Sequence, residues 1–315
     1  MNDAITDALG WSLVHSTWQG LAVAMLYSLF LALTWRARPQ WKYLAGCFAL
    51  SVLLAAVGAT FFLQLERPPL PVVAGGVEAA PSNEIAVIGS PEEPGRPTNI
   101  ADVSAPGFEQ ASWHERVSQW LPGMVVVWIV GVLIFTVRLV VRWWAARRLC
   151  SRGVSPVSDE IEAMARRLAA RLRVSRTVSV LRSTTVFVPS VVGWFKPVIL
   201  LPAATLAGLS TYDVEAILAH ELAHIRRHDY LVNLLQHLAE ALLFFHPAVW
   251  WISRRIRIER EYCCDDLAVE ASGSRLDYSR ALAVLERLRG TSATPSAALP
   301  LAADGGSLLA RIQRL

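Results

Sequence analysis

Three long runs of apolar residues dominate the first half of the chain, and each is long enough to cross a bilayer as a helix. They lie at residues 11–33, 43–65 and 117–137 and hold no aspartate, glutamate, lysine or arginine. A secretory signal peptide is not expected, because the chain starts with the acidic residues Asp3 and Asp7 rather than with basic ones. The pattern therefore predicts three transmembrane helices.

The charges between these runs predict their orientation. Residues 36–42 and 138–152 are basic, whereas residues 66–116 are rich in proline and carry more acids than bases. Cytoplasmic loops accumulate lysine and arginine, and a Pro-rich acidic composition is typical of disorder. The predicted parts are two transmembrane helices with a short basic cytoplasmic loop (1–65), a disordered extracytoplasmic loop (66–116), a third transmembrane helix (117–142) and a cytoplasmic domain (143–315).

Beyond residue 143 the chain mixes short β-prone runs with helical patterns. Ser158 is expected to cap a helix, because Asp159 and Glu160 occupy its first turn and apolar residues then recur at helical spacing. The predicted strands are Val178–Leu181, Val186–Val192 and Val198–Leu201. The later predicted helices are 230–245, 248–271, 274–289 and 308–315.

A helix that begins after Ser210 carries the clearest chemical motif of the chain. Ser210 and Asp213 form an S-x-x-D variant of the capping box, and an apolar stripe follows at helical spacing. Within it, His220, Glu221 and His224 form the pattern H-E-x-x-H. Histidines four residues apart share one helix face and can bind one zinc ion, with the glutamate as general base. The alternative is two solvated histidines on a surface helix.

A catalytic zinc site normally has three protein ligands and one water, so a further ligand is required. The predicted helix 248–271 contains the acidic sequence E-R-E-Y-C-C-D-D at 259–266. We expect Glu261 to be the third ligand and Asp265, one turn later on the same face, to accept the N–H of a zinc-bound histidine. Glu259 is the rival ligand, Cys264 is another, and a solvated helix face remains the alternative.

The predicted strands lead directly into the H-E-x-x-H helix, and this suggests how a peptide would bind. In zinc peptidases an edge strand near the metal commonly holds the substrate backbone by strand addition. We expect such a strand within Val186–Val192 or Val198–Leu201, with a purely structural hairpin as the alternative. Residues 291–306 are rich in alanine, serine and proline, and we expect self-cleavage there.

The composition supports a membrane protein and narrows its partners. Hydrophobic residues make up 54% of the chain and the mean hydropathy is +0.38, values that are unusual for a soluble domain. The net charge of +4 comes from arginines at membrane ends or on helices that also carry acids, so membrane lipid is expected as a partner and direct nucleic-acid binding is not. The four cysteines lack paired metal spacing and indicate reduced thiols.

Several motifs together resemble the BlaR/MecR-type family of membrane-embedded zinc peptidases. They are PSVVGWFKPVILLP at 189–202, HELAHIRRHDY at 220–230, FFHPAVWW at 244–251 and EREYCCDD at 259–266. The resemblance implies an α-helical membrane protein with a cytoplasmic α+β zincin-like (gluzincin) metalloprotease domain. It also implies a multi-pass protein of the bacterial inner membrane that uses zinc.

In the signalling members of that family, activation leads to removal of a transcriptional repressor of the BlaI/MecI type. A cytoplasmic repressor is therefore the substrate that the resemblance implies. The chain departs from those members because it lacks a fourth apolar run and an S-x-x-K acylation motif; Pro39 and Gly193 stand three residues before Lys42 and Lys196. A β-lactam stimulus is not expected, and a truncated chain and a short family member are both consistent with the sequence.

Two other functions compete with regulated proteolysis of a repressor. A quality-control protease resembling the HtpX/Ste24 group shares H-E-x-x-H and a downstream E-x-x-x-D, but the FFHPAVWW segment and the Pro-rich loop favour the first interpretation. A non-catalytic receptor would keep zinc as a structural clamp. Glu221 argues against a clamp, because a structural site needs no general base.

Overall fold

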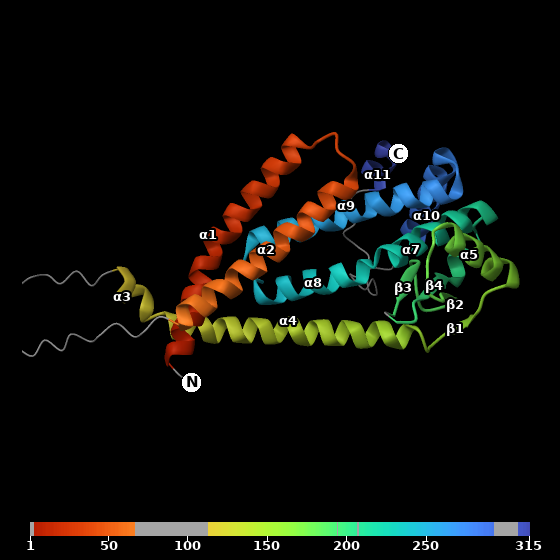
Figure 1. The fold of residues 1–315 in the computed structure, drawn as a ribbon. Coiled ribbons are helices and arrows are strands. Elements are labelled where there is room, and N and C mark those ends of the chain that lie inside the picture. The colour runs from red at the N-terminus through yellow and green to blue at the C-terminus, as the bar shows by residue number, and fades with distance from the viewer. Residues whose placement is uncertain (1–2, 67–112, 194, 207, 293–307) are drawn as a thin grey trace, which may run out of the picture.

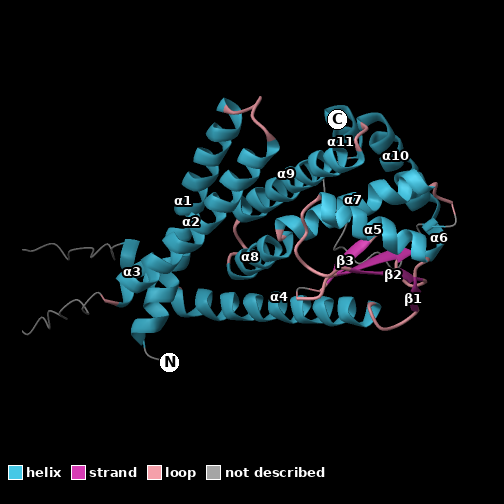
Figure 2. Cartoon of the chain, turned by 45° about the vertical axis from the view of Figure 1, so that its right-hand side comes forward, coloured by secondary structure: helices cyan, strands magenta, loops and turns pink. Residues whose placement is uncertain are grey.

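The computed structural model describes residues 3–66, 113–193, 195–206, 208–292 and 308–315. Long helices make up most of it, and a small sheet lies at the end of the molecule remote from the N-terminus (Figures 1 and 2). The helices of the first half are α1 (Asp3–Leu33), α2 (Pro39–Leu65), α3 (Trp113–Ser118) and α4 (Leu121–Leu149). The rest of the chain alternates strands and helices before it becomes wholly helical.

Three helical stretches among the described residues are long and apolar enough to cross a membrane, and they include the three runs expected from the sequence. They are Ala4–Leu33, Pro39–Leu65 and Arg116–Leu149. The second helix begins before the apolar run because Pro39 occupies its first turn, where the missing N–H costs nothing. The helices α1 and α2 pack side by side as a hairpin, and α1 also contacts α4 (Figure 1).

Helices cross two boundaries of the predicted parts. Residues 113–116 of the expected disordered loop belong to α3, while residues 67–112 of that loop lie outside the described residues. The third span is predicted to end at residue 142, and its helix α4 continues to Leu149. Arginine is a good helix former, so the basic residues after the apolar run extend this helix rather than end it.

The sheet has four short strands in the order β1-β2-β4-β3. The strands are β1 (Val154–Pro156), β2 (Ser179–Ser183), β3 (Ser190–Val192) and β4 (Val198–Pro202). The strands β2 and β4 are parallel, with Leu181 opposite Leu200, and the outer pairs are antiparallel. The strand β1 was not predicted, because a three-residue strand that ends in proline shows no alternation.

Between and after the strands, seven helices complete the domain. They are α5 (Asp159–Arg171), α6 (Ala203–Leu206), α7 (Thr211–Arg227), α8 (Asp229–Leu242), α9 (Pro247–Ser272), α10 (Arg275–Ser292) and α11 (Leu308–Arg314). The helix α7 begins with the expected capping box: Asp213 N–H donates to the Ser210 hydroxyl and Ser210 N–H to the Asp213 carboxylate. It ends at His228, whose left-handed conformation (φ 58°) turns the chain directly into α8.

The buried apolar residues form two cores, and α9 belongs to both. In the first, α5, β2, β4, α7 and α10 enclose residues such as Leu168, Ile199 and Leu222, together with Ala268 near the end of α9. In the second, the membrane helices α1 and α2 pack with α8 against the first half of α9. The cytoplasmic domain expected from the sequence is therefore not separate from the membrane helices.

The turn between α8 and α9 is fixed against the membrane helices. His246 Nδ1 accepts a hydrogen bond from Ala248 N–H at the start of α9, so Nε2 carries the ring proton and donates to the Ser16 carbonyl (3.1 Å) on α1. Gly20 permits this approach, since a Cβ there would lie 2.2 Å from His246 Nε2. Through His246, the FFHPAVWW segment (244–251) thus ties the start of α9 to α1, and we call this contact the joint.

Loss of the side chain should lower the free energy of unfolding by different amounts at the two N-cap serines, Ser210 and Ser158. Ser210→Ala removes a side-chain cap of α7 and should lower the free energy of unfolding by about 1 kcal/mol. Ser158→Ala is the matched control, because Ser158 stands at the N-cap of α5 but makes no side-chain cap hydrogen bond. Urea titration in mild detergent measures both changes. Equal losses would contradict the assigned role of the Ser210 hydroxyl.

Candidate metal centre

The structure brings His220 and His224 of α7 together with Glu261 of α9. The two Nε2 atoms are 3.2 Å apart, and the Glu261 carboxylate lies 3.4 Å from His220 Nε2 and 3.9 Å from His224 Nε2. Four ligands placed tetrahedrally at about 2.1 Å from zinc are separated by roughly 3.4 Å. These three side chains therefore fit a zinc ion in spacing and in donor type.

The outer nitrogen of His220 faces a buried hydrogen-bond network. The Tyr278 hydroxyl donates to Asp265 Oδ1 (2.7 Å) and lies 2.9 Å from His220 Nδ1, so its oxygen lone pair faces the imidazole. Asp265 Oδ1 itself is 3.3 Å from the same nitrogen. Both neighbours are acceptors toward His220, which places the ring proton on Nδ1 and leaves Nε2 free to bind a metal.

Asp265 is held from its other side by an arginine of the last helix. Arg311 of α11 donates from Nε to Asp265 Oδ2 (2.9 Å) and from its terminal nitrogen to Oδ1. Burial tends to raise the pKa of the fully buried Asp265, but hydrogen bonds from His220 and Arg311 hold it far below the usual range. Asp265 is therefore an anion at neutral pH.

The outer nitrogen of His224 has a different carboxylate partner. Asp229 is the first residue of α8, and its Oδ2 lies 2.8 Å from His224 Nδ1. The single left-handed residue His228 folds α8 back, so that a carboxylate five residues after His224 reaches its ring. Asp229 is buried, and its contact with His224 Nδ1 leaves Nε2 of that ring turned toward His220 and Glu261.

The charges of the cluster suit a cation. Burial tends to raise the pKa of Glu261, but His220, His224 and Arg260 hold it well below the usual range. Burial tends to lower the pKa of His220, yet its contacts with Asp265 and Glu261 raise it to about 9. Without a metal ion, His220 therefore carries a second proton, on the Nε2 that faces Glu261, and binding of a metal ion would displace it.

Two other residues expected as possible ligands are not part of the group His220, His224 and Glu261. Glu259 is buried on the side of α9 that faces the second core and forms an ion pair with Arg255 (3.0 Å). Cys264 lies behind His224, with Sγ 3.3 Å from its Nδ1 and 3.4 Å from Asp229 Oδ2. Burial raises the pKa of the Cys264 thiol well above its usual value. With His224 and Asp229, Cys264 forms a second group of side chains whose ligand atoms lie close enough together to hold a metal ion.

Sequence reasoning did not identify four residues of this network. Asp229, Tyr278, Arg311 and Arg260 approach the cluster from α8, α10, α11 and α9. The sequence does place an acidic residue, Asp229, five residues after His224. This carboxylate reaches the His224 ring only because His228 between them is left-handed. Glu221 is half-buried on α7 beside His220, about 100° further round the helix.

The sheet topology decides between the two strands proposed to bind substrate. Strand β4 lies between β2 and β3, which pair with it on both sides over 198–200, so β4 is not an edge strand and the second of the two expected runs is excluded. Strand β3 covers only Ser190–Val192 of the predicted run, has a free edge and contacts α7. Strand addition at β3 stays a prediction. The expected self-cleavage site, 291–306, lies outside the described residues from 293 onward.

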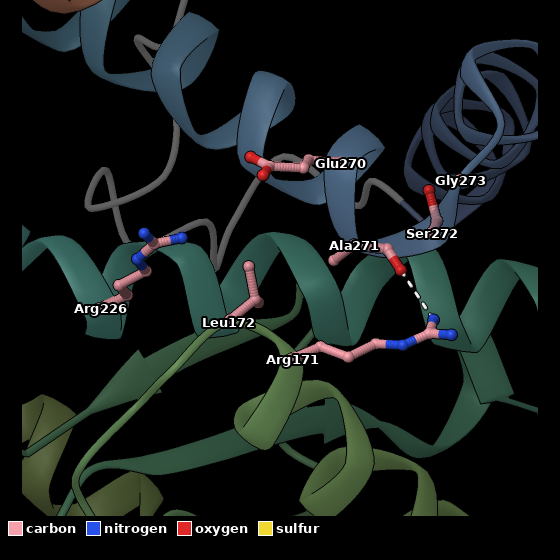
Figure 3. Close-up of a pocket in the computed structure, with 7 residues that line it drawn as sticks. All are labelled: Arg171, Leu172, Arg226, Glu270, Ala271, Ser272 and Gly273. Atoms are coloured by element: carbon pink, nitrogen blue, oxygen red, sulfur yellow. Dashed lines mark hydrogen bonds between the residues drawn. The ribbon is translucent and has the colours of Figure 1, made fainter.

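A surface pocket of about 370 Å³ is lined by residues other than His220, His224 and Glu261. It is bordered by the end of α5, by α7 and by the end of α9, and Figure 3 shows Arg171 bonded to the Ala271 carbonyl across it (2.9 Å). Arg226 and Glu270 line its other side. None of the residues that line it belongs to the cluster, so this pocket is not the candidate site.

Comparison with known proteins identifies the family. The chain is 22% identical over 260 residues to the regulatory protein BlaR1 of Bacillus licheniformis. The matched stretch covers 81% of the chain and 42% of that protein. It is 27% identical over 88 residues to the methicillin resistance mecR1 protein of Staphylococcus aureus, or 28% of the chain and 15% of that protein. The matches thus cover less than half of either relative. The profile of the BlaR1 peptidase M56 family matches residues 20–315, and the chain belongs to that family.

Proposed function

We propose that the chain is a membrane-anchored zinc endopeptidase in which His220, His224 and Glu261 bind zinc. The observation that carries this proposal is the convergence of two Nε2 atoms and one carboxylate at zinc spacing. The outer nitrogens of both histidines face buried oxygen atoms, as in zinc sites where second partners fix the ring. Membership of a peptidase family supports hydrolysis of peptide bonds.

The chemistry is divided among the residues of the chain. When bound, zinc supplies a Lewis acid that lowers the pKa of water and polarises a carbonyl. Glu221 takes the proton of the attacking water and returns it to the leaving amine nitrogen. His220 and His224 keep their orientation through Tyr278, Asp265 and Asp229.

We further propose that the domain faces the cytoplasm of a bacterium and that its substrate is a transcriptional repressor of the BlaI/MecI type. The basic residues that follow the first and third spans support this orientation. Similarity to a protein named as regulatory supports signalling, and the family match favours this function over quality control. The proposed function is regulated proteolysis.

The choice between the two glutamates is tested by metal content. Glu261→Ala should lower zinc affinity at least about tenfold, because loss of an outer partner alone costs that much. Glu259→Ala is the control, since Glu259 is buried on the same helix but pairs with Arg255. Zinc stoichiometry of the purified chain, measured with a competing chelator, distinguishes them. Loss of zinc only in Glu259→Ala would transfer the ligand role to Glu259.

The general base is tested by a charge-neutral substitution. Glu221→Gln should abolish self-cleavage between residues 291 and 306 while zinc content stays unchanged, because the amide cannot accept the proton of water. Mass spectrometry of the incubated wild type and variant measures the cleavage. If zinc had only a structural role, wild type and Glu221→Gln would give the same result in this measurement. Cleavage that persists in the variant would mean that another protease produces it, and the proposal of self-cleavage would be wrong.

The orientation is tested by labelling introduced cysteines in spheroplasts with a membrane-impermeant maleimide. Pro94→Cys should react in intact spheroplasts, because residues 66–116 are expected outside. Ser151→Cys follows α4 and is exposed, so it should react only after lysis. The wild type gives the background of the native cysteines. The opposite pattern would reverse the proposed topology.

A further inference from the structure

The second hydrophobic core joins the membrane helices directly to the helices around the candidate metal centre. In this core, side chains of α1 and α2 pack against side chains of α9. They include Tyr27 of α1, Tyr43 and Leu50 of α2, and Ile256 and Cys263 of α9. The helix α2 runs close to α9 (Figure 1). Cys263 of this core is adjacent in sequence to Cys264, which contacts His224. The membrane helices therefore reach within one layer of side chains of the cluster.

One hydrogen bond crosses that layer. The Tyr43 hydroxyl of α2 donates to Asp229 Oδ1 (3.2 Å), and the other oxygen of Asp229 lies 2.8 Å from His224 Nδ1. Tyr43 and Asp229 are both buried, so water does not replace this contact. A continuous path of two hydrogen bonds thus runs from a membrane helix to a candidate zinc ligand.

We infer that Tyr43 is a positioning residue of the metal centre, which orients His224 through Asp229. The inference rests on the proposed zinc site and assigns part of it to α2. It makes α2 a component of the centre rather than only a membrane anchor.

The physical reason is the division of labour between the two oxygens of Asp229. Oδ2 faces His224 Nδ1, with the Cys264 thiol at 3.4 Å. Oδ1 receives the Tyr43 hydroxyl and lies 3.5 Å from Arg227 Nε, a buried atom with no hydrogen-bond partner among the described residues. The Tyr43 hydroxyl is therefore the only hydrogen-bond donor to Oδ1 in the described part of the chain. Without it, Oδ1 keeps only the longer contact with Arg227, and the carboxylate aligns His224 less tightly.

The ring of Tyr43 also holds the neighbouring cation. The guanidinium carbon of Arg227 lies 4.5 Å from the ring centroid, within the range of a cation–π contact. Tyr43→Phe keeps the ring and this contact but removes the hydroxyl. The substitution therefore isolates the hydrogen bond to Asp229.

Tyr27 provides a matched control. Its exposed fraction is 4% against 5% for Tyr43, it belongs to the same core, and its hydroxyl also donates one hydrogen bond. That bond goes to the backbone carbonyl of Lys42 (3.1 Å) and not toward the metal cluster. A purely structural role would make Tyr27→Phe and Tyr43→Phe similar in every measurement.

The experiment uses the full chain in detergent, loaded with zinc or with cobalt as a spectroscopic probe. Tyr43→Phe should lower zinc affinity about three- to tenfold, less than loss of a direct partner of the histidine. It should also shift the visible absorption of the cobalt form, whereas Tyr27→Phe should change neither. In an Asp229→Asn background, Tyr43→Phe should have no further effect, because the two residues act as one path.

The outcomes separate this inference from the proposed function. Zinc bound by the wild type, with equal affinity and cobalt spectra for Tyr43→Phe and Tyr27→Phe, would overturn the role of Tyr43 alone. Additive losses for Tyr43→Phe and Asp229→Asn would overturn it as well. A wild type that binds no zinc, or whose affinity is unchanged by His224→Ala, would overturn the proposed function and the inference with it.

Discussion

Two buried carboxylates, Asp229 and Asp265, impose the constraint on which the candidate site depends. An ionised carboxylate removed from water costs several kcal/mol unless charges and hydrogen bonds compensate it. The partners that compensate these two are Tyr43 of α2, Arg227 of α7, Tyr278 of α10 and Arg311 of α11. Elements far apart in the sequence must therefore assemble around the carboxylates before either histidine has a fixed orientation. Folding of the domain and preparation of the site are the same event.

The helix α9 makes this assembly possible because it takes part in two cores. Its residues from Val249 to Cys263 contribute to the core with the membrane helices, and Ala268 near its end packs with the sheet and α7. Glu261 and Asp265 lie near the junction of these regions, on the face opposite the buried Glu259. Residues of α9 both before and after Glu261 are packed in a core, so the helix is fixed on both sides of this residue. Its position relative to α7 is therefore well defined.

The sequence predicts the local parts of this arrangement well. The capping box at Ser210 and the apolar stripe define α7, and the E-x-x-x-D spacing brings Glu261 and Asp265 onto one face of α9. It does not predict what tertiary packing decides. Asp229 reaches His224 only through one left-handed residue, Arg311 arrives from beyond residues 293–307, and the place of β4 inside the sheet follows from a parallel pairing that no local pattern shows.

The contact of His246 with α1 fixes how far each residue of α9 lies from the membrane helices. The joint at the FFHPAVWW segment fixes the start of α9 among the membrane helices, and Glu261 follows Pro247 by fourteen residues. At a rise of 1.5 Å per residue, this separates the joint from the proposed zinc ligand by about 21 Å along the helix. In the proposed peptidase, the peptide bond to be cleaved would have to lie at that fixed distance from the joint. The packing that sets this distance would thus also set how far a substrate segment must extend from the joint.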